Sequence, residues 1–295
     1  MKLKKQITVI IPVYNASDLL EKCLISLKNQ TCNLFDVIVI DDGSIDKNVE
    51  KLSKQYFNVI RLANNVGPAK ARNIGIANAK TEVIAFTDSD CEVNIDWIEN
   101  MIKIFNNPEI DAIMGKVNIP QSGYIGDSIS CLGFPAGGWP GYKFMYNIGP
   151  DNISSHLSTC NCAVRRNIFN ITGGFDEEFP TPGREDTEFS IRLIDNKYRI
   201  KYCDNVIVSH IPRTSIKSLI KMCINRGRGT YHLKQKISSR VMNYYIKLRY
   251  KTTLLIFKKN FFSHRFPMIF FLTILSFICH YYGQIVEKRK SKKEK

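Results

Sequence analysis

The sequence lacks the glycine-rich loops with which the commonest nucleotide-dependent enzymes hold phosphate groups. Neither G-x-G-x-x-G nor G-x-x-x-x-G-K-[ST] occurs in its 295 residues, which disfavours dinucleotide redox chemistry and P-loop hydrolysis. Its nine cysteines include no C-x-x-C pair and no zinc-ligand spacing. We interpret them as structural thiols in a reducing compartment. The N-terminus, MKLKKQ, is not expected to be a signal peptide, because the apolar run behind it is short and ends in a proline.

Acidic residues are almost missing from the C-terminal part of the chain. Residues 211–295 contain 20 Lys and Arg but only Glu287 and Glu294, a local balance of +18. Residues 1–210 contain 22 Lys and Arg against 25 Asp and Glu, a balance of −3, so the net charge of +15 belongs to the C-terminal part. This asymmetry predicts a polyanion or an anionic membrane surface as its partner.

A long uncharged stretch interrupts this basic region. Residues 266–286 contain no Lys, Arg, Asp or Glu, and as a helix they would rise about 30 Å, enough to cross a bilayer. Tyr281 and Tyr282 lie near one end, where interfacial aromatics are found. Both flanks are basic, so a simple span has no preferred orientation, whereas an in-plane or re-entrant segment keeps both flanks cytoplasmic. We expect attachment to the cytoplasmic face of the cell membrane rather than nucleic-acid binding; a buried core helix is the alternative.

The first 110 residues alternate between β-branched runs and helical patterns. Strands are expected at residues 7–12, 35–40, 59–62 and 82–87, and helices at 17–29, 46–56, 68–79 and 95–105, with Ser17 able to cap the first helix. This alternation predicts an α/β domain with a mostly parallel sheet. The glycine- and proline-rich residues 133–141 are expected to form a loop, either mobile over a site or a plain surface crossover.

Carboxylates follow two of the expected strands. Asp41 and Asp42 come after one strand, and Asp88 and Asp90 in the motif TDSD come after another. An isolated D-x-D is typical of a turn. Ligands of open α/β sheets, however, bind outside the carboxyl ends of the strands. Two acidic groups at that edge would repel each other unless cations or hydrogen-bond donors compensate them.

These carboxylates belong to an ordered set of motifs along the chain. The set comprises VIIPVYN (9–15), DDGS (41–44) with Asp46 close behind, NVGPAKARNIG (65–75), TDSD (87–90), CNCAVRRNIFNITGGFDEEF (160–179), REDTEFSIRL (184–193) and NRGRG (225–229). In number, order and spacing they resemble the family-two glycosyltransferases with the GT-A fold, over about residues 5–230. The resemblance implies a mostly parallel central sheet with helices on both faces, and an inverting, metal-dependent enzyme that uses nucleotide-sugar donors. The Q-x-x-R-W signature of processive synthases is absent, which disfavours polymer extension.

On the donor side, the resemblance assigns roles to the strand ends. Asp90 looks like the metal-coordinating carboxylate, and Asp88 like the group that binds the ribose and the metal site. Asp42 resembles the carboxylate that accepts a base N–H, with Tyr14 able to stack on the ring and Pro12 fixing the strand exit. A diphosphate-linked donor needs a divalent cation or basic groups, and Mn²⁺ and Mg²⁺ prefer oxygen ligands.

Basic side chains and one histidine complete the expected donor site. Arg72, with Lys70 nearby, is expected to face the donor, and Arg226 and Arg228 to contact its diphosphate. His210 resembles the histidine that completes the metal site in many relatives. The alternatives are exposed helix cations for the four basic residues and a structural role for the histidine.

The segment Arg184-Glu185-Asp186 resembles the family's Glu-Asp motif. Inversion by a single displacement needs a base within reach of the acceptor hydroxyl, and the resemblance assigns this role to Asp186, with Glu185 positioning the acceptor or supporting the base. Residues 173–177 resemble the acceptor-side turn. Without the upstream motifs, the same segment would be an ordinary acidic helix start.

The sequence thus predicts an enzyme that transfers one sugar from a nucleotide-diphosphate donor to a hydroxyl of a lipid-linked or cell-envelope glycan, with Mn²⁺ or Mg²⁺. A UDP-sugar is favoured, because Asp42 and Tyr14 are compatible with uridine. A nucleotidyltransferase of similar fold and a basic nucleic-acid-binding protein are the alternatives. The expected parts are a catalytic domain at 1–211 (donor half 1–110, acceptor half 111–211), a basic helical segment at 212–262, a hydrophobic segment at 263–286 and a basic tail at 287–295.

Overall fold

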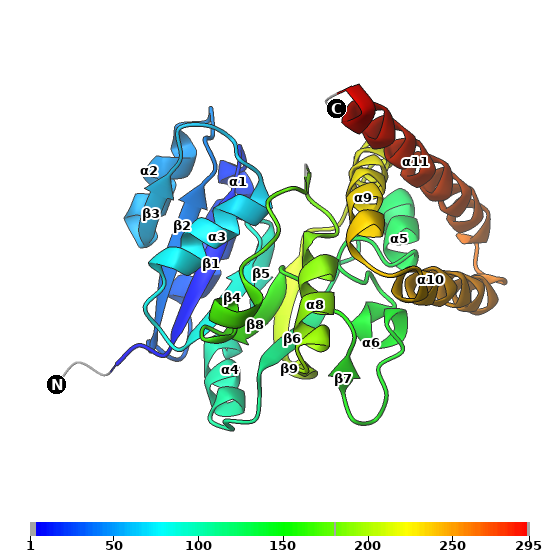
Figure 1. Ribbon diagram of the computed structural model, residues 1–295. Coiled ribbons are helices and arrows are strands. Elements are labelled where there is room, and N and C mark those ends of the chain that lie inside the picture. The colour runs from blue at the N-terminus through cyan, green and yellow to red at the C-terminus, as the bar shows by residue number, and fades with distance from the viewer. Residues whose placement is uncertain (1–3, 180, 294–295) are drawn as a thin grey trace.

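The computed structural model describes residues 4–179 and 181–293, so the ends of the predicted catalytic domain (1–3) and basic tail (294–295) lie outside the described residues. One sheet forms the centre of the molecule, with strand order β3-β2-β1-β4-β8-β6-β9-β5 and β7 paired to β9 (Figure 1). Helices α9, α10 and α11 gather at the opposite side of the molecule from β3 and α2 (Figure 1).

The N-terminal half has the expected alternation. Its parallel strands are β1 (Ile7–Val13), β2 (Phe35–Asp41), β3 (Asn58–Arg61) and β4 (Val83–Thr87), and its helices are α1 (Ser17–Lys28), α2 (Asn48–Tyr56), α3 (Pro68–Asn78) and α4 (Trp97–Phe105). Each predicted element is confirmed within about two residues. The cap assigned to Ser17 is wrong, because Ala16 is the N-cap residue of α1 and no side chain caps it. Ser17 instead hydrogen-bonds to Asp46, which lowers the pKa of that carboxyl.

The second half makes the sheet mixed rather than mostly parallel. Strand β8 (Asn161–Arg165) is antiparallel to both β4 and β6 (Ala112–Asn118). Strand β9 (Ile200–His210) is parallel to β6, whereas β5 (Cys91–Val93) and β7 (Ile153–Ser154) are antiparallel to β9. Of the eight strand pairings among residues 4–179 and 181–293, four are therefore antiparallel. The parallel prediction holds for the four N-terminal strands, where helices connect successive strands.

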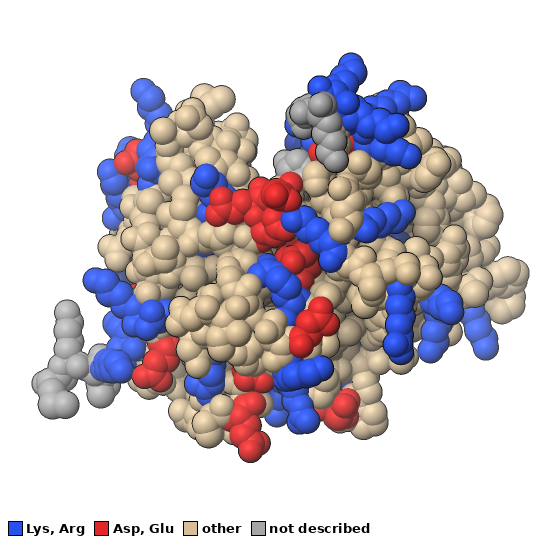
Figure 2. Space-filling view, viewed as in Figure 1, with Lys and Arg blue, Asp and Glu red and all other residues tan. Residues whose placement is uncertain are grey.

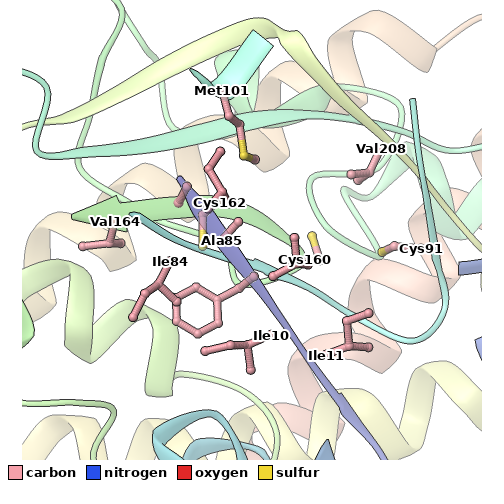
Figure 3. Packing of buried hydrophobic residues seen from close by; sticks show 14 of the residues in the cluster. Ile10, Ile11, Ile84, Ala85, Cys91, Met101, Cys160, Cys162, Val164 and Val208 are labelled. Carbon is pink, nitrogen blue, oxygen red and sulfur yellow. The ribbon is translucent and has the colours of Figure 1, made fainter. Parts of the chain in front are cut away.

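Apolar residues of the central strands form the main core. Ile10, Ala85 and Cys162 are fully buried, and Figure 3 shows them packed together with Cys160. All nine cysteines are free, which agrees with the prediction of structural thiols. The strands read as continuous apolar runs because helices cover them, as is usual for parallel strands.

The predicted loop at 133–141 is mostly buried rather than exposed. It connects α5 (Gly123–Cys131) to the short α6 (Gly141–Met145), and Phe134 within it is only 9% exposed. A Cβ on Gly138 would lie 2.1 Å from the carbonyl oxygen of Ser130, so only glycine fits this close packing. The segment is thus a packed connection.

Three C-terminal helices follow α7 (Ile168–Thr172) and α8 (Glu185–Asp195): α9 (Ile216–Lys236), α10 (Ser239–Asn260) and α11 (Phe266–Lys293). Helix α11 lies alongside α9 (Figure 1), and a Cβ on Gly227 would come within 2.1 Å of the His280 carbonyl oxygen. At the far end of α11, the buried Glu287 pairs with Arg228 at 2.6 Å and lies 3.0 Å from His232. Residues 266–293, which include most of the predicted hydrophobic segment and the described part of the basic tail, form one continuous helix.

Candidate functional site

Several strands bring polar side chains to one end of the sheet. Asp42 follows β2, Asp88 and Asp90 follow β4, and His210 is the last residue of β9. Because β8 is antiparallel to both β4 and β6, and β6 is parallel to β9, the carboxyl ends of β2, β4 and β9 point the same way. Figure 2 shows a hollow between the N-terminal half and the C-terminal helices, with acidic side chains on its floor.

Asp90 and His210 lie together at this edge, as the sequence predicts. Nε2 of His210 is 3.6 Å from Oδ1 of Asp90, too far for a normal hydrogen bond. The other ring nitrogen, Nδ1, lies 3.0 Å from the carbonyl oxygen of Ile211 and therefore carries the proton of that hydrogen bond. In the neutral ring, the lone pair of Nε2 then lies next to the carboxylate oxygen. Two acceptors side by side suit a bound cation, and the Sγ atom of Cys91 completes a group of three ligand atoms within 4.8 Å of one another.

Arg72 is buried and connects the two acidic parts of the site. Its Nη2 is 2.9 Å from Oδ1 of Asp88, and its Nη1 is 3.0 Å from Oε1 of Glu185. The second oxygen of Glu185 accepts a 2.7 Å hydrogen bond from the Gly183 N–H, and the guanidinium lies over the ring of Phe175. Burial, followed by the neighbouring Asp186, raises the pKa of Glu185, while Arg72 opposes this shift. That Arg72 faces the donor stays a prediction; in the structure its guanidinium pairs with two carboxylates, one of which, Asp88, is also predicted at the donor site.

Asp186 lies in the first turn of α8 and has one oxygen largely free. Its Oδ1 accepts hydrogen bonds from the backbone N–H and the hydroxyl of Thr187, while Oδ2 is 3.8 Å from Nε2 of His156. Burial raises the pKa of Asp186, but the net direction is downward, because the neighbouring His156, Arg226, the Thr187 N–H and Arg184 together outweigh burial. Burial lowers the pKa of His156 to about 4, so that ring is neutral at pH 7. Asp186 is therefore ionised at neutral pH, as a base must be.

Asp42 and Tyr14, the predicted base-binding pair, differ in their surroundings. The carboxylate of Asp42 is buried and already accepts hydrogen bonds from Val66 N–H at 2.7 Å, Gly67 N–H at 2.9 Å and Asn65 Nδ2 at 3.0 Å. Asp42 therefore holds the turn that starts α3. The ring of Tyr14, in contrast, is 46% exposed and is available for stacking.

Two further residues predicted on the donor side, Pro12 and Lys70, are partly exposed. Pro12 lies in β1 opposite Ile40 and is half-buried. Lys70 is on α3, half-exposed, with its Nζ 3.6 Å from the Glu177 carboxylate. The turn at residues 173–177 packs against the same helix, because Asn73 hydrogen-bonds to the backbone of Phe175.

Arg226 and Arg228 diverge, although the sequence suggested that both contact the diphosphate. Arg228 forms an ion pair with Glu287 on α11, so it is not at the site. Arg226 lies over the ring of Phe134, with Cζ 5.6 Å from the ring centroid. Residues two apart on a helix face different directions, which explains the divergence.

Sequence reasoning missed His156 and Arg213. His156 is 4% exposed, stacks on Tyr146 at 4.2 Å, and has a buried Nδ1 without a hydrogen-bond partner in the described part of the chain. Arg213 follows β9. Burial raises the pKa of Asp90, and the positive charge of Arg213 opposes this shift in part. Neither residue stands in a recognisable motif, and only the tertiary structure brings them to the carboxylates.

Two family models match the chain. Residues 8–172 match the model described as glycosyl transferase family 2, and residues 140–214 match the model described as the N-terminal domain of galactosyltransferase. The first match covers more than half of the chain. It begins in β1, ends at the last residue of α7, and includes the strand ends that carry Asp42, Asp88 and Asp90.

Known proteins are similar in both sequence and fold. The chain is 27% identical to glycosyltransferase AglE of Haloferax volcanii, over 76% of this chain and 72% of that protein. It is 30% identical to the O-antigen chain rhamnosyltransferase RfbN of Salmonella typhimurium, over 70% of this chain and 66% of that protein. The mannosyltransferase PcManGT of Pyrobaculum calidifontis, solved with GDP-Man and Mn²⁺, has a similar fold, with a TM-score of 0.63, 14% identity and coverage of 96% of this chain and 88% of that chain.

Proposed function

The chain belongs to glycosyl transferase family 2, and from that premise we propose that it transfers one sugar from a nucleoside-diphosphate donor to a hydroxyl group, with inversion. The observation that carries this proposal is that the Asp90–His210 pair and Asp186 belong to one site. Arg72 connects the two parts, because it pairs with Asp88 on one side and with Glu185 on the other. The acceptor we propose is a lipid-linked or cell-envelope glycan. The name of the O-antigen rhamnosyltransferase to which the chain is similar supports that class. Family membership favours sugar transfer over nucleotide transfer.

In the proposed reaction, Asp186 acts as the base. Its Oδ2 takes the proton of the acceptor hydroxyl while that oxygen bonds to the anomeric carbon of the donor sugar. The bond between this carbon and the phosphate oxygen breaks at the same time, and the nucleoside diphosphate leaves from the opposite face. Thr187 holds the other oxygen, Oδ1, through two hydrogen bonds, which fixes the direction of Oδ2. Glu185 directly precedes Asp186 in the chain. It supports the base because its ion pair with Arg72 holds this part of the chain in place.

Asp90 and His210 are the residues proposed to hold a divalent cation, with Asp88 next to them. A cation bound there would neutralise the charge that develops on the leaving diphosphate. The mixed carboxylate and imidazole set suits Mn²⁺ better than Mg²⁺, which prefers oxygen ligands and water. The Mn²⁺ and GDP-Man of the similar mannosyltransferase structure are consistent with this choice.

The donor base is proposed to stack on Tyr14, beside the turn that Asp42 holds. Pro12 and Lys70 border the same region, and a UDP-sugar remains the donor that this pair predicts. Within the described residues no contact of the site selects the sugar, so a panel of nucleotide sugars is the direct way to identify the donor. Binding of the correct donor to the folded state raises the melting temperature, by the equivalent of about 2.7 kcal/mol at a hundredfold excess over Kd.

Replacing Asp90 with alanine is expected to abolish the Mn²⁺-dependent part of donor binding. Removing one of few ligands of the cation should weaken donor affinity at least about tenfold in Mn²⁺, with little change in EDTA. The measurement is a thermal shift with each nucleotide sugar, together with release of nucleoside diphosphate. Glu92→Ala is the matched control, because Glu92 is exposed two residues away. An unchanged Mn²⁺-dependent shift in Asp90→Ala would contradict the metal assignment, and a wild type without donor hydrolysis would contradict the proposed function.

We further propose that the protein lies on the cytoplasmic face of the membrane, with α11 in the plane of the interface. By length and composition α11 is long and apolar enough to cross a bilayer, but 33% of its most apolar window is buried against the protein. Its outer side exposes apolar side chains, and so do α10 and the turn between the two helices. We call this set the apolar helix face; it comprises Tyr250, Leu254, Leu255, Phe261, Phe262, Phe270, Phe271, Ile274, Phe277, Ile278, Tyr281 and Tyr282. Exposed lysines, Lys251, Lys258 and Lys259, border this face. A spanning α11 would lose its contact with α9 and the ion pair of Glu287, whereas an in-plane helix keeps both.

The double variant Phe271→Ser/Ile278→Ser is expected to lose most of its binding to vesicles that contain anionic lipid. These side chains are 51% and 60% exposed, and withdrawing each from the interface should weaken partitioning at least about tenfold. Co-sedimentation of the full chain with phosphatidylserine vesicles measures the effect. Ile171→Ser is the control, because Ile171 is 66% exposed on α7 and outside the apolar helix face. Equal sedimentation of the two variants would contradict the membrane assignment.

A further inference from the structure

Three arginines from different parts of the chain gather beside the proposed base. Arg184 precedes α8, Arg226 is on α9 and Arg249 is on α10. The guanidinium carbons of Arg226 and Arg249 lie 5.6 Å and 5.0 Å from the ring centroid of the same residue, Phe134. A Cβ on Gly183 would be 3.0 Å from Cγ of Arg226, so Arg226 also packs against the segment that carries Arg184. The chain therefore brings the three cations to one place.

Within the described part of the chain, these three arginines have too few acidic neighbours to balance their charge. Within the described residues, none of the three takes part in an ion pair; Arg184 donates to the Thr230 hydroxyl at 3.1 Å, and Arg249 donates to the Leu132 carbonyl at 3.3 Å. Burial, together with the neighbouring charge of Arg226, lowers the pKa of Arg184 to about 10 and that of Arg249 to about 10. Both remain protonated at neutral pH, so the cluster stays positive.

An unbalanced cation cluster is unfavourable for folding unless an anion binds to it. Among the described residues, Asp186 is the carboxylate that interacts with both Arg184 and Arg226, and Glu185 is already paired with Arg72. Three guanidiniums against one carboxylate leave a charge of +2, which matches a phosphate monoester or a diphosphate diester. The planar guanidinium fork is also the side chain best suited to phosphate oxygens.

The position of the cluster assigns this anion to the acceptor rather than to the donor. The groups that shift the pKa of Asp90, where the cation and the donor diphosphate are proposed to bind, are His210, Asp88 and Arg213. The charges that act on Asp186 include Arg226 and Arg184. On this geometry, and resting on the proposed function, we propose that Arg184, Arg226 and Arg249 bind a phosphate or diphosphate group of the acceptor. This contact holds the acceptor hydroxyl against Asp186.

The phosphate could be carried by a membrane lipid or by a soluble sugar phosphate. Arg249 immediately precedes Tyr250, which is 60% exposed and belongs to the apolar helix face. Farnesyl phosphate and farnesyl diphosphate carry the same anion on an apolar chain, whereas inorganic phosphate and pyrophosphate carry it alone. Comparing the two pairs distinguishes the sources, since a lipid-borne acceptor makes the farnesyl compounds bind more tightly.

The test measures binding of these four probes to the full chain in EDTA, so that no divalent cation contributes. The wild type is expected to bind at least one probe, and Arg226→Gln and Arg249→Gln are expected to weaken that binding about tenfold each. Lys247→Gln should bind like the wild type, because Lys247 is exposed on the same helix as Arg249. Melting temperatures measured without ligand identify a variant that fails to fold. If one of the two arginine variants fails in this way, the probe affinity of the other tests the proposal. A wild type that binds none of the probes, or two arginine variants with wild-type affinity, would overturn the proposal.

Donor hydrolysis without acceptor separates this proposal from the proposed function. Arg249→Gln should retain wild-type hydrolysis of the donor in Mn²⁺ while it loses phosphate binding. Normal hydrolysis in a wild type that binds no phosphate probe would overturn the acceptor site alone. Phosphate binding that depends on Arg226 and Arg249, in a wild type that hydrolyses no nucleotide sugar, would support the site and overturn the proposed function.

Discussion

Asp186→Asn is expected to bind the donor and Mn²⁺ like the wild type but to lose about a thousandfold in the rate of sugar transfer. Asparagine has nearly the same shape and can keep a hydrogen bond to Thr187, but it cannot take a proton from the acceptor. Because donor binding is proposed to depend on Asp90 and its neighbours, the thermal shift by the nucleotide sugar should stay unchanged. Single-turnover transfer to an acceptor measures the chemical step without the contribution of product release.

Asp195→Asn is the matched control for this variant. Asp195 is the last residue of the same helix, α8, and is exposed, so its replacement should leave transfer and donor binding unchanged. Full transfer by Asp186→Asn would show that another group takes the proton. Loss of donor binding in Asp186→Asn would show instead that the residue acts on the donor side.

The sequence predicts the strand ends well because the signal there is local. Apolar β-branched runs define the strands, and the carboxylates that follow them, such as Asp42 and Asp90, must lie at their carboxyl ends once the sheet is parallel. The same reasoning fails for the second half of the sheet, because no local pattern reports that β8 runs antiparallel between β4 and β6. His210 was nevertheless predicted beside Asp90, since the resemblance to known motifs carried information that strand patterns do not.

Contacts between distant side chains were beyond prediction. Arg72 and Glu185 are 113 residues apart in the chain, and no pattern in either motif indicates that they pair. The motif NRGRG suggested two similar arginines, yet helical geometry turns Arg226 toward Phe134 and Arg228 toward Glu287. His156 has no motif at all, and its importance follows only from its burial beside Asp186.

Arg72→Met is expected to lower the free energy of unfolding by about 3–5 kcal/mol. Arg72 is 4% exposed and has carboxylate partners on both sides, of which Glu185 is also buried. Methionine fills a similar volume but leaves the charge of Glu185 without a cation, and an unpaired buried carboxylate is strongly unfavourable. Urea denaturation followed by circular dichroism measures the change. Lys70→Met is the control on the same helix, because the 3.6 Å pair of Lys70 with Glu177 is exposed and should contribute less than about 1 kcal/mol.

The double variant Arg72→Met/Glu185→Gln separates charge from packing. If the loss in Arg72→Met comes from the unpaired carboxylate, then neutralising Glu185 should restore a large part of the stability, and the two changes will not be additive. Additive losses would show that Arg72 stabilises the fold mainly through its contact with Phe175 and its aliphatic carbons. Because Arg72 joins the end of β4 to the start of α8, recovered stability without recovered transfer would also show that this ion pair aligns the proposed donor site with the proposed base.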